Sequence, residues 1–342
     1  MALDAPPEED NPKRRASDHP DSPASSKKRE VVGEIANLDI QSPSTNGESS
    51  STEESKQLSP CSIYRYLHAI EMDENKRPLG NYIGTVQKRM TNDMREILID
   101  WLIEVTEEFK LISDTLYIGV CCIDRFLSVR PLDKNYLQLL GITAILIASK
   151  QADISPPPGE RLCFMTDNTY AISEVIQMEK DVLECLNSDL CYPTSRNFLR
   201  ILIGIFHSHT NTLRCTKPFD YLVSKKYDQQ MEFLACYLLE LCLLSSKCIK
   251  FLPSIAAASA IFLSRFILEP KDHPWTQELE CRSGYKASDL QECVLAIHDV
   301  HSNISEWHVQ AVREKYMKSK FMSMASMTAV EVPANYFESI DQ

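Results

Sequence analysis

The sequence predicts an all-α protein in which two copies of a five-helix unit follow a disordered N-terminal tail. From about residue 60 onward, apolar residues recur at i, i+3, i+4 and i+7, which is the period of an amphipathic helix. Glycine is scarce, at 9 of 342 residues, which disfavours folds rich in β-hairpins and glycine-rich phosphate loops. The length allows roughly two domains, and segments about 115 residues apart are similar to each other.

Residues 1–58 are expected to be the disordered tail. They contain no Phe, Trp or Tyr, and the first such residue is Tyr64. Serine, proline and charged residues dominate, so burial could not offset the entropy lost on ordering. The Ser-Pro dipeptides at Ser22, Ser42 and Ser59 are candidate phosphorylation sites. We therefore interpret this segment as an address and control region.

Two basic triplets stand in the tail, separated by eleven residues: Lys13, Arg14 and Arg15, then Lys27, Lys28 and Arg29. The arrangement is similar to a bipartite nuclear import signal, in which each cluster meets an acidic groove of the import receptor. The alternative is ordinary solvated charge in a disordered segment. The first interpretation predicts a nuclear protein with some of it in the cytoplasm.

The helices can be placed in order from their start and stop signals. Residues 91–93 can cap a helix whose apolar run is 94–105. Ser113 and Asp114 open the next helix, and Pro131 stops it. Two further helices are expected at 137–148, where small residues permit close crossing, and at 170–190, ended before Pro193.

A weak internal repeat relates the two halves. The segment ILIASK at 145–150 is echoed by AIFLSR at 260–265. TLYIGVCCIDRFL at 115–127 has a similar weight and period to EFLACYLLELCLL at 232–244. The offset fits two copies of a five-helix unit joined around Tyr192-Pro193.

Composition excludes several function classes. A net charge of -12 argues against a nucleic-acid binder, because phosphate binding requires a basic face. No apolar run approaches the roughly 18–20 residues of a membrane span, and the N-terminus lacks an apolar signal core. We therefore expect a soluble, intracellular protein that binds neither nucleic acid nor membranes.

The cysteines and histidines do not suggest a metal or redox centre. The 12 cysteines include no C-x-x-C pair and lie in apolar runs, where a free thiol packs as a small hydrophobe. The nearest approach to a ligand cluster is His298, His301 and His308 with Cys293, but no carboxylate or second thiol completes it. Core or surface histidines are the better interpretation. No nucleophile–base set or nucleotide loop emerges, so we expect no enzyme, no metal and no cofactor.

The stretch MREILIDWLIEV at 94–105 resembles the MRxILxDWLxEV signature of A- and B-type cyclins. Five further motifs follow in the family's order: TLYIGVCCIDRFLS, LQLLGITAILIASK, TDNTY, MEKDVL and PTSRNFL. The C-terminal VREKYMKSKF and VPANYF are most similar to the third subgroup of plant A-type cyclins. The resemblance implies two five-helix cyclin boxes, at 59–191 with a leading helix and at 192–322, followed by a tail at 323–342.

The resemblance also implies a kinase-binding site at Lys150, Glu179 and Ile154. In the family, the matching lysine and glutamate pair with each other and hydrogen-bond the backbone of the kinase's mobile helix. Periodicity alone cannot bring Lys150 and Glu179 together, since they lie on different expected helices. An unremarkable surface ion pair is the alternative interpretation.

A second implied site is a shallow groove that docks Arg-x-Leu peptides of substrates and inhibitors. The matching residues are Met94, Ile97, Leu98, Trp101, Leu137 and Gln138, with Glu104 placed to meet the arginine of the peptide. An apolar stripe with an indole anchor and one carboxylate suits such a peptide. Without the resemblance, the simpler interpretation is that Met94, Ile97 and Trp101 face the core.

Two departures from the family pattern qualify these expectations. After Lys150, the usual aromatic residue and one of two acids are replaced by Gln151 and Ala152, which predicts weaker or altered kinase choice. The R-x-x-L-x-x-x-x-N destruction signal is matched by Arg29 and Asn37, with Val32 in place of leucine. The shorter side chain removes about 1 kcal/mol of apolar anchor, so we expect a weaker but usable degron for a ubiquitin ligase of the anaphase-promoting type.

The sequence therefore predicts a non-catalytic regulatory subunit that binds and activates a cyclin-dependent serine/threonine kinase, between the G1/S transition and mitosis. The alternatives are a B-type mitotic cyclin and a diverged cyclin with weak activation. A DNA-binding scaffold with cyclin-like folds is disfavoured by the acidic charge. A helical enzyme using the histidine cluster lacks a complete set of residues.

Overall fold

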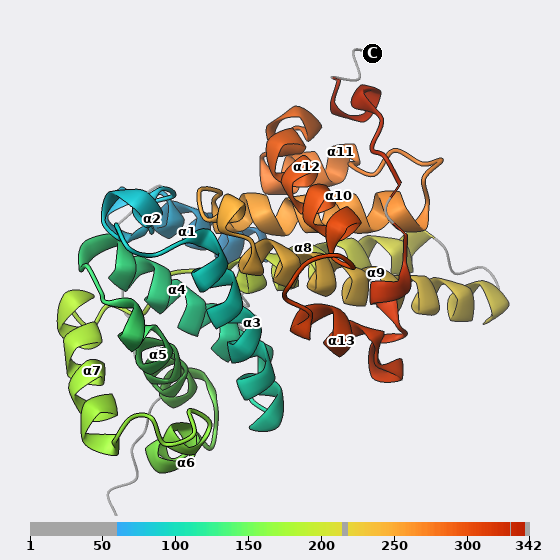
Figure 1. Ribbon diagram of the computed structural model, residues 1–342. Coiled ribbons are helices and arrows are strands. Elements are labelled where there is room, and N and C mark those ends of the chain that lie inside the picture. The colour runs from blue at the N-terminus through green and yellow to red at the C-terminus, as the bar shows by residue number, and fades with distance from the viewer. Residues whose placement is uncertain (1–59, 214–217, 329, 339–342) are drawn as a thin grey trace, which may run out of the picture. The chain divides into compact units, whose positions relative to one another are not determined.

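The two halves of the chain repeat one arrangement of five helices (Figure 1). A computed structural model describes residues 60–213, 218–328 and 330–338. The first unit contains α3 (Asn92–Glu108), α4 (Ser113–Val129), α5 (Leu137–Ala152), α6 (Gly159–Phe164) and α7 (Ile172–Cys185). The second contains α8 (Ser195–Leu213), α9 (Pro218–Leu244), α10 (Pro253–Leu268), α11 (Gln277–Ser283) and α12 (Ala287–Asn303). The predicted tandem all-helical fold is confirmed, and the described ranges contain no β-strand.

Each unit is built around one buried helix, α5 in the first and α10 in the second. From Leu137 to Ser149, all residues of α5 except Gln138 are buried. Gly141 lets α3 cross α5 closely, because a Cβ at this position would lie 2.9 Å from Leu98 Cδ1. This crossing fixes which side of α3 faces the core.

The predicted starts of the helices agree with the structure, but one predicted helix end does not. The Thr91 hydroxyl accepts a hydrogen bond from the Met94 N–H and caps α3, as expected. The helix predicted at 170–190 is shorter, since α7 ends at Cys185. Asn187 and Ser188 adopt left-handed backbone angles that an α-helix cannot continue through. The chain therefore leaves the helix well before Pro193.

Two helices outside the five-helix units contact the unit that is more distant in sequence. Helix α1 (Pro60–Glu71) packs on α8, and Glu71 accepts a hydrogen bond from the Ser254 N–H of α10 at 3.0 Å. Helix α13 (Ala311–Met317) packs on α3, where Asp100 accepts from the Ala311 N–H at 2.8 Å. The leading helix, which the sequence analysis grouped with the first box, thus makes these contacts with the second.

Short elements complete the connections. They are α2 (Tyr82–Thr85) and the 3-10 helices η1 (Glu74–Lys76), η2 (Lys134–Tyr136), η3 (Ser246–Cys248), η4 (Ser319–Phe321), η5 (Met324–Ser326) and η6 (Ala334–Phe337). No helix among the placed residues is both long and apolar enough to span a bilayer. The ten cysteines whose side chains the structure places are free thiols, as expected.

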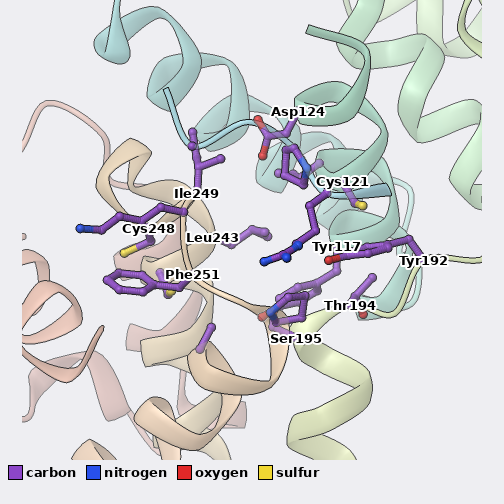
Figure 2. Close-up of a pocket in the computed structure, with 18 of the residues that line it drawn as sticks. Tyr117, Cys121, Asp124, Tyr192, Thr194, Ser195, Leu243, Cys248, Ile249 and Phe251 are labelled. Atoms are coloured by element: carbon purple, nitrogen blue, oxygen red, sulfur yellow. The ribbon is translucent and has the colours of Figure 1, made fainter. Parts of the chain in front are cut away.

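A cavity of about 380 Å³ lies where the two units meet (Figure 2). Residues of the first unit, among them Tyr117 and Asp124, face residues 248–251 of the second across it. None of the residues predicted to bind a kinase or a peptide lines this cavity. It belongs to the junction of the two units rather than to either expected site.

Candidate partner-binding surfaces

Lys150 and Glu179 form a close ion pair on the surface of the first unit. Lys150 lies in the last turn of α5 and Glu179 in α7, which packs along α5. The ammonium nitrogen is 2.6 and 2.8 Å from the two carboxylate oxygens. The lysine side chain is 47% exposed and the glutamate 18% exposed. The fold thus brings together two residues that the sequence places far apart.

Ile154 follows directly after α5 and is fully exposed. An isolated exposed isoleucine is common on protein surfaces, but here it lies four residues from Lys150. The edge of the first unit therefore presents a cation, a carboxylate and an uncovered aliphatic side chain. These are the three residues assigned to kinase binding from the resemblance.

Residues 151–153 are the segment that departs from the family pattern. Their only acid, Asp153, has a structural role. Asp153 accepts a hydrogen bond from the Ile112 N–H at 3.0 Å and another from the Thr115 hydroxyl. These bonds cap the start of α4, so both carboxylate oxygens are used within the chain. The Gln151 side chain is exposed. Residues 151–153 therefore offer a partner the Gln151 amide and one carboxylate that is already hydrogen-bonded within the chain.

A cavity of about 350 Å³ lies between α3 and α5, where a peptide groove was predicted. It is lined by Met94, Ile97, Leu98, Trp101, Leu137 and Gln138, together with Lys134 and Asn135 of η2. Six of the seven predicted residues are thus brought together. Glu104 is exposed but does not line the cavity; it lies one helical turn beyond Trp101.

Lys134 and Asn135 were not predicted. They precede Leu137, and the Asp133 carboxylate fixes their short turn by accepting from the Asn135 N–H at 3.0 Å. A lysine three residues before the predicted groove residue Leu137 was the only available signal. Lys134 adds a positive charge at the rim of an otherwise apolar groove.

Exposure distinguishes the groove from a core-facing stripe. Ile97 is 53% exposed, whereas its neighbour Leu98 is 6% exposed and packs against α5. Met94 and Trp101 are half-buried. The alternative that all of these residues face the core is wrong for Ile97, because α3 presents one side to α5 and another to solvent.

The histidines singled out in the sequence do not share a site with one another. His301 is buried, and neither of its ring nitrogens is hydrogen-bonded to any residue that the structure describes. Burial, followed by the nearby His298, lowers the pKa of its imidazole to about 4. His298 lies within 2.8 Å of the Val330 carbonyl oxygen. His308 instead faces the start of α3.

The features predicted for the N-terminal tail lie outside the described residues. They are the import signal at Lys13, Arg14, Arg15, Lys27, Lys28 and Arg29, the degron at Arg29, Val32 and Asn37, and the Ser-Pro sites at Ser22, Ser42 and Ser59.

Comparison with known proteins defines the class. Residues 62–191 match the family described as cyclin, N-terminal domain, and residues 193–330 match cyclin, C-terminal domain. Cyclin-A3-2 of Arabidopsis thaliana is 45% identical over 81% of this chain and 71% of its own length. Cyclin-A3-1 of rice is 42% identical over 82% of this chain and 72% of its own length.

A solved structure shows the same fold. The viral cyclin from herpesvirus saimiri aligns with a TM-score of 0.55 at 22% identity, covering 69% of this chain and 95% of its own. The chain therefore belongs to the cyclin family. Its relatives confirm the predicted A-type plant cyclin of the third subgroup. As a cyclin, it is a regulatory and non-catalytic subunit of protein kinases.

Proposed function

We propose that this chain binds and activates a cyclin-dependent serine/threonine kinase in control of the cell cycle, between the G1/S transition and mitosis. The observation that carries the proposal is the Lys150–Glu179 pair beside the uncovered Ile154. The pair joins the last turn of α5 to α7, and Ile154 lies two residues beyond the end of α5. This edge of the first unit fits a helix of a partner kinase.

The chemistry of the pair suits backbone recognition. The ammonium group of a lysine has three N–H donors. The contacts of Lys150 with Glu179 occupy only part of these donors. Each carboxylate oxygen can accept more than one hydrogen bond. A kinase helix whose backbone reaches this edge therefore meets a free donor beside free acceptors. Ile154 supplies apolar area next to them.

The energetics favour a role in binding rather than in folding. A pair this exposed contributes about 0–1 kcal/mol to the stability of the free chain. Once a partner excludes water, loss of either member leaves an uncompensated buried charge, which costs about 3–5 kcal/mol. The same pair is therefore nearly neutral in the free chain and important in the complex.

Activation follows if the chain binds the active conformation of the kinase better than the inactive one. A ligand shifts a conformational equilibrium only by its difference in affinity for the two states. A thousandfold shift requires about 4 kcal/mol of such difference. In the active conformer, the kinase lysine and the glutamate of its mobile helix pair to orient the ATP phosphates.

The groove between α3 and α5 serves as a second contact for substrates and inhibitors that carry an Arg-x-Leu sequence. Ile97, Trp101 and Leu137 offer the apolar surface for the leucine. Glu104, one turn farther along α3, is placed to meet the arginine. Holding a substrate at this groove raises its concentration near the kinase active site.

The tail motifs extend the proposal to location and lifetime. The two basic triplets at 13–15 and 27–29 are assigned to nuclear import, and the segment 29–37 to recognition by a ubiquitin ligase of the anaphase-promoting type. Deletion of 29–37 is expected to lengthen the half-life of the chain. An unchanged half-life would contradict the degron.

The test is the histone kinase activity of a purified A-class cyclin-dependent kinase, measured with and without the full chain. We expect activity to rise with the chain and to collapse with Glu179→Ala. Binding without activity would instead support the second candidate, a diverged cyclin with weak activation. The observation that favours this candidate is that Asp153, the single acid of residues 151–153, is already hydrogen-bonded to the start of α4.

A further inference from the structure

Four carboxylates are buried in the part of the chain whose side chains are placed: Glu71, Glu96, Asp124 and Glu240. Three of them contact a basic group. Glu71 contacts His68, Asp124 contacts Arg95, and Glu240 contacts Lys315. Glu96 forms no ion pair among these residues; its Oε1 only accepts a hydrogen bond from the Ser246 N–H at 3.0 Å.

The exception calls for an explanation, because buried charges in proteins are paired or coordinate metals. The nearby cations are committed elsewhere. Arg95 is bound to Asp124, and the Lys247 ammonium lies 2.9 Å from Asp299. The groups that do surround the Glu96 carboxylate are a second acid and an imidazole.

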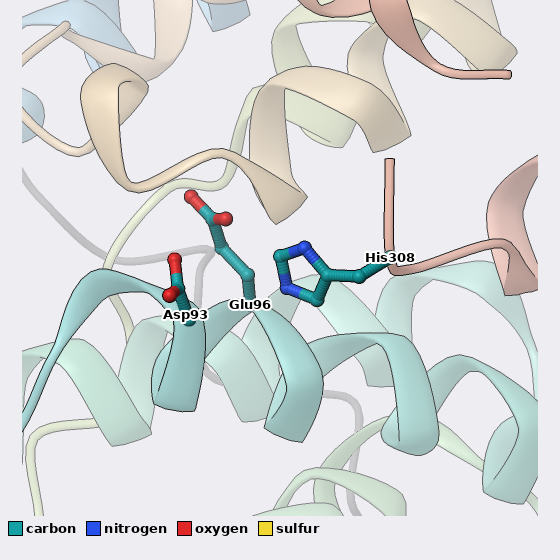
Figure 3. A group of neighbouring side chains, drawn as sticks. All are labelled: Asp93, Glu96 and His308. Carbon is teal, nitrogen blue, oxygen red and sulfur yellow. The ribbon is translucent and has the colours of Figure 1, made fainter. Parts of the chain in front are cut away.

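These two groups are Asp93 and His308 (Figure 3). One ligand atom from each of Asp93, Glu96 and His308 lies within 4.8 Å of the others. Asp93 and Glu96 rise from the first turns of α3, and the His308 ring points toward them from a distant segment of the chain. Among the residues whose side chains are placed, the Asp93 carboxylate and the His308 imidazole form no hydrogen bond or ion pair, and the His308 ring packs edge-on against Trp307.

The surroundings also favour a cation. A cavity of about 430 Å³ adjoins the cluster and is lined by four acids and one lysine: Asp93, Glu96, Asp299, Glu306 and Lys247. The space admits water molecules that could complete a coordination shell. The four acids and the one lysine together give the cavity lining three net negative charges.

We propose that Asp93, Glu96 and His308 bind a divalent transition metal, with zinc as the best fit. Zinc accepts both carboxylate oxygens and imidazole nitrogens as ligands, and it can combine three protein ligands with a water in the fourth position. Magnesium prefers oxygen ligands alone. Zinc–ligand bonds of about 2.0–2.2 Å require the exposed Asp93 and His308 side chains to rotate inward around the fixed Glu96.

The site would join the two cyclin boxes. Asp93 and Glu96 belong to α3 of the first unit. His308 lies in the connection that follows α12, the last helix of the second unit, and precedes α13. A bound ion would therefore stabilise the junction and compensate the buried charge of Glu96. This role is independent of the proposed kinase binding.

The test is zinc binding to the full chain, reduced and stripped with a chelator, in competition with a fluorescent zinc indicator. Cysteines also bind zinc, so the informative quantity is the difference between variants. We expect Asp93→Asn and His308→Gln each to weaken one zinc site by more than tenfold. Asp299→Asn is the matched control, because Asp299 lines the same cavity without belonging to the cluster, and it should leave this site in place.

Cobalt(II) gives a second readout. We expect His308→Gln to lose visible d–d bands that the wild type shows, while any sulfur-to-cobalt charge transfer from the cysteines is the same in both. Thermal unfolding of the metal-free variants checks that they fold, and only the wild type and Asp299→Asn should gain melting temperature with zinc. Equal zinc affinity in the wild type and both ligand variants would overturn the proposal. Equal stabilisation of the chain by magnesium would also overturn the proposal. Stabilisation of the metal-free chain by acid would overturn it too, because protonated His308 would then be the cation.

Discussion

The Arg95 guanidinium binds Asp124 in a bidentate ion pair, with Nε and Nη2 at 2.8 and 2.7 Å from the two carboxylate oxygens. Both residues are buried. The same guanidinium donates to the Leu244 carbonyl of the second unit at 3.0 Å, and Tyr82 donates to Asp124 at 2.8 Å. One arginine of the MREIL motif therefore ties two helices of the first box to the end of α9 in the second.

Loss of this pair should destabilise the whole chain. We expect Asp124→Ala to lower the free energy of unfolding by about 3–5 kcal/mol, because Arg95 would be left as an uncompensated buried charge. Chemical denaturation of the purified chain measures this change.

The matched control is Arg200→Ala. Arg200 also forms an ion pair that joins the two units, with Asp114 at 2.6 Å, but its side chain is 58% exposed. We expect a loss below about 1 kcal/mol. Equal losses for the two variants would show that burial does not determine the contribution of these pairs.

Exchange of the charges at Lys150 and Glu179 separates folding from kinase binding. The double variant Lys150→Glu with Glu179→Lys retains an ion pair, so its stability should lie within about 1 kcal/mol of the wild type. The exchange moves the hydrogen-bond donor and acceptor positions, however, so we expect the affinity of the chain for the kinase to fall more than tenfold. Surface plasmon resonance measures this affinity.

The control is the same exchange at Lys247 and Asp299, an exposed pair on the second unit with a 2.9 Å contact. It should leave kinase affinity unchanged. Full kinase binding by the exchanged Lys150 and Glu179 variant would mean that the pair does not contact the kinase backbone.

Local signals allowed much of the fold to be predicted from the sequence. Thr91 caps α3 through its own hydroxyl, and the repeat between 145–150 and 260–265 places α5 and α10 as equivalent central helices. The contacts of α1 and α13 could not be predicted in this way. The bond from Ser254 to Glu71 and that from Ala311 to Asp100 join distant segments, and nothing in the local pattern indicates either partner.

The candidate sites show the same contrast between residues indicated by a local pattern and residues brought together only by the fold. The groove residues of α3 follow one helical stripe, so six of the seven predicted residues line it. Lys134 was missed because its turn carries no apolar pattern. No carboxylate could be assigned to His308 from the sequence, because Asp93 and Glu96 belong to α3 and lie far from His308 along the chain.

Ile97 and Leu98 should separate peptide docking from stability, although they are adjacent. Ile97 is exposed in the groove, so Ile97→Ala should cost less than about 1 kcal/mol of stability and weaken an Arg-x-Leu peptide more than tenfold. Leu98→Ala should cost about 2–5 kcal/mol, because it opens a cavity against α5. Fluorescence anisotropy of a labelled peptide and chemical denaturation measure the two effects.

Ile112→Ala is the control for removal of an exposed isoleucine outside the groove, since Ile112 is 46% exposed. It should affect neither measurement strongly. If Ile97→Ala binds the peptide as tightly as Ile112→Ala does, the groove is not the docking site.

His301 should make the stability of the second box depend on pH. Its pKa is about 4 in the folded chain, against 6.5 for an unperturbed imidazole, because burial disfavours the charged form. The unfolded chain therefore binds more protons between these values. The stabilisation is fully present above pH 6.5 and is lost as the pH falls toward 4, by up to about 3 kcal/mol.

The variant His301→Phe isolates this effect. Neither ring nitrogen of His301 has a partner, and the ring lies edge-on to Tyr237 at 5.6 Å, so phenylalanine should fit without loss of a hydrogen bond. We expect its stability at pH 7.5 to equal or exceed that of the wild type. Between pH 6.5 and 4.5, its free energy of unfolding should fall less steeply than that of the wild type.

His298→Gln tests the cause of the shift. His298 contributes to the low pKa of His301, but burial is the larger effect. The wild-type pH dependence should therefore persist in His298→Gln and disappear only in His301→Phe. If the two variants lose the same part of the slope, repulsion between the histidines, rather than burial, keeps His301 neutral.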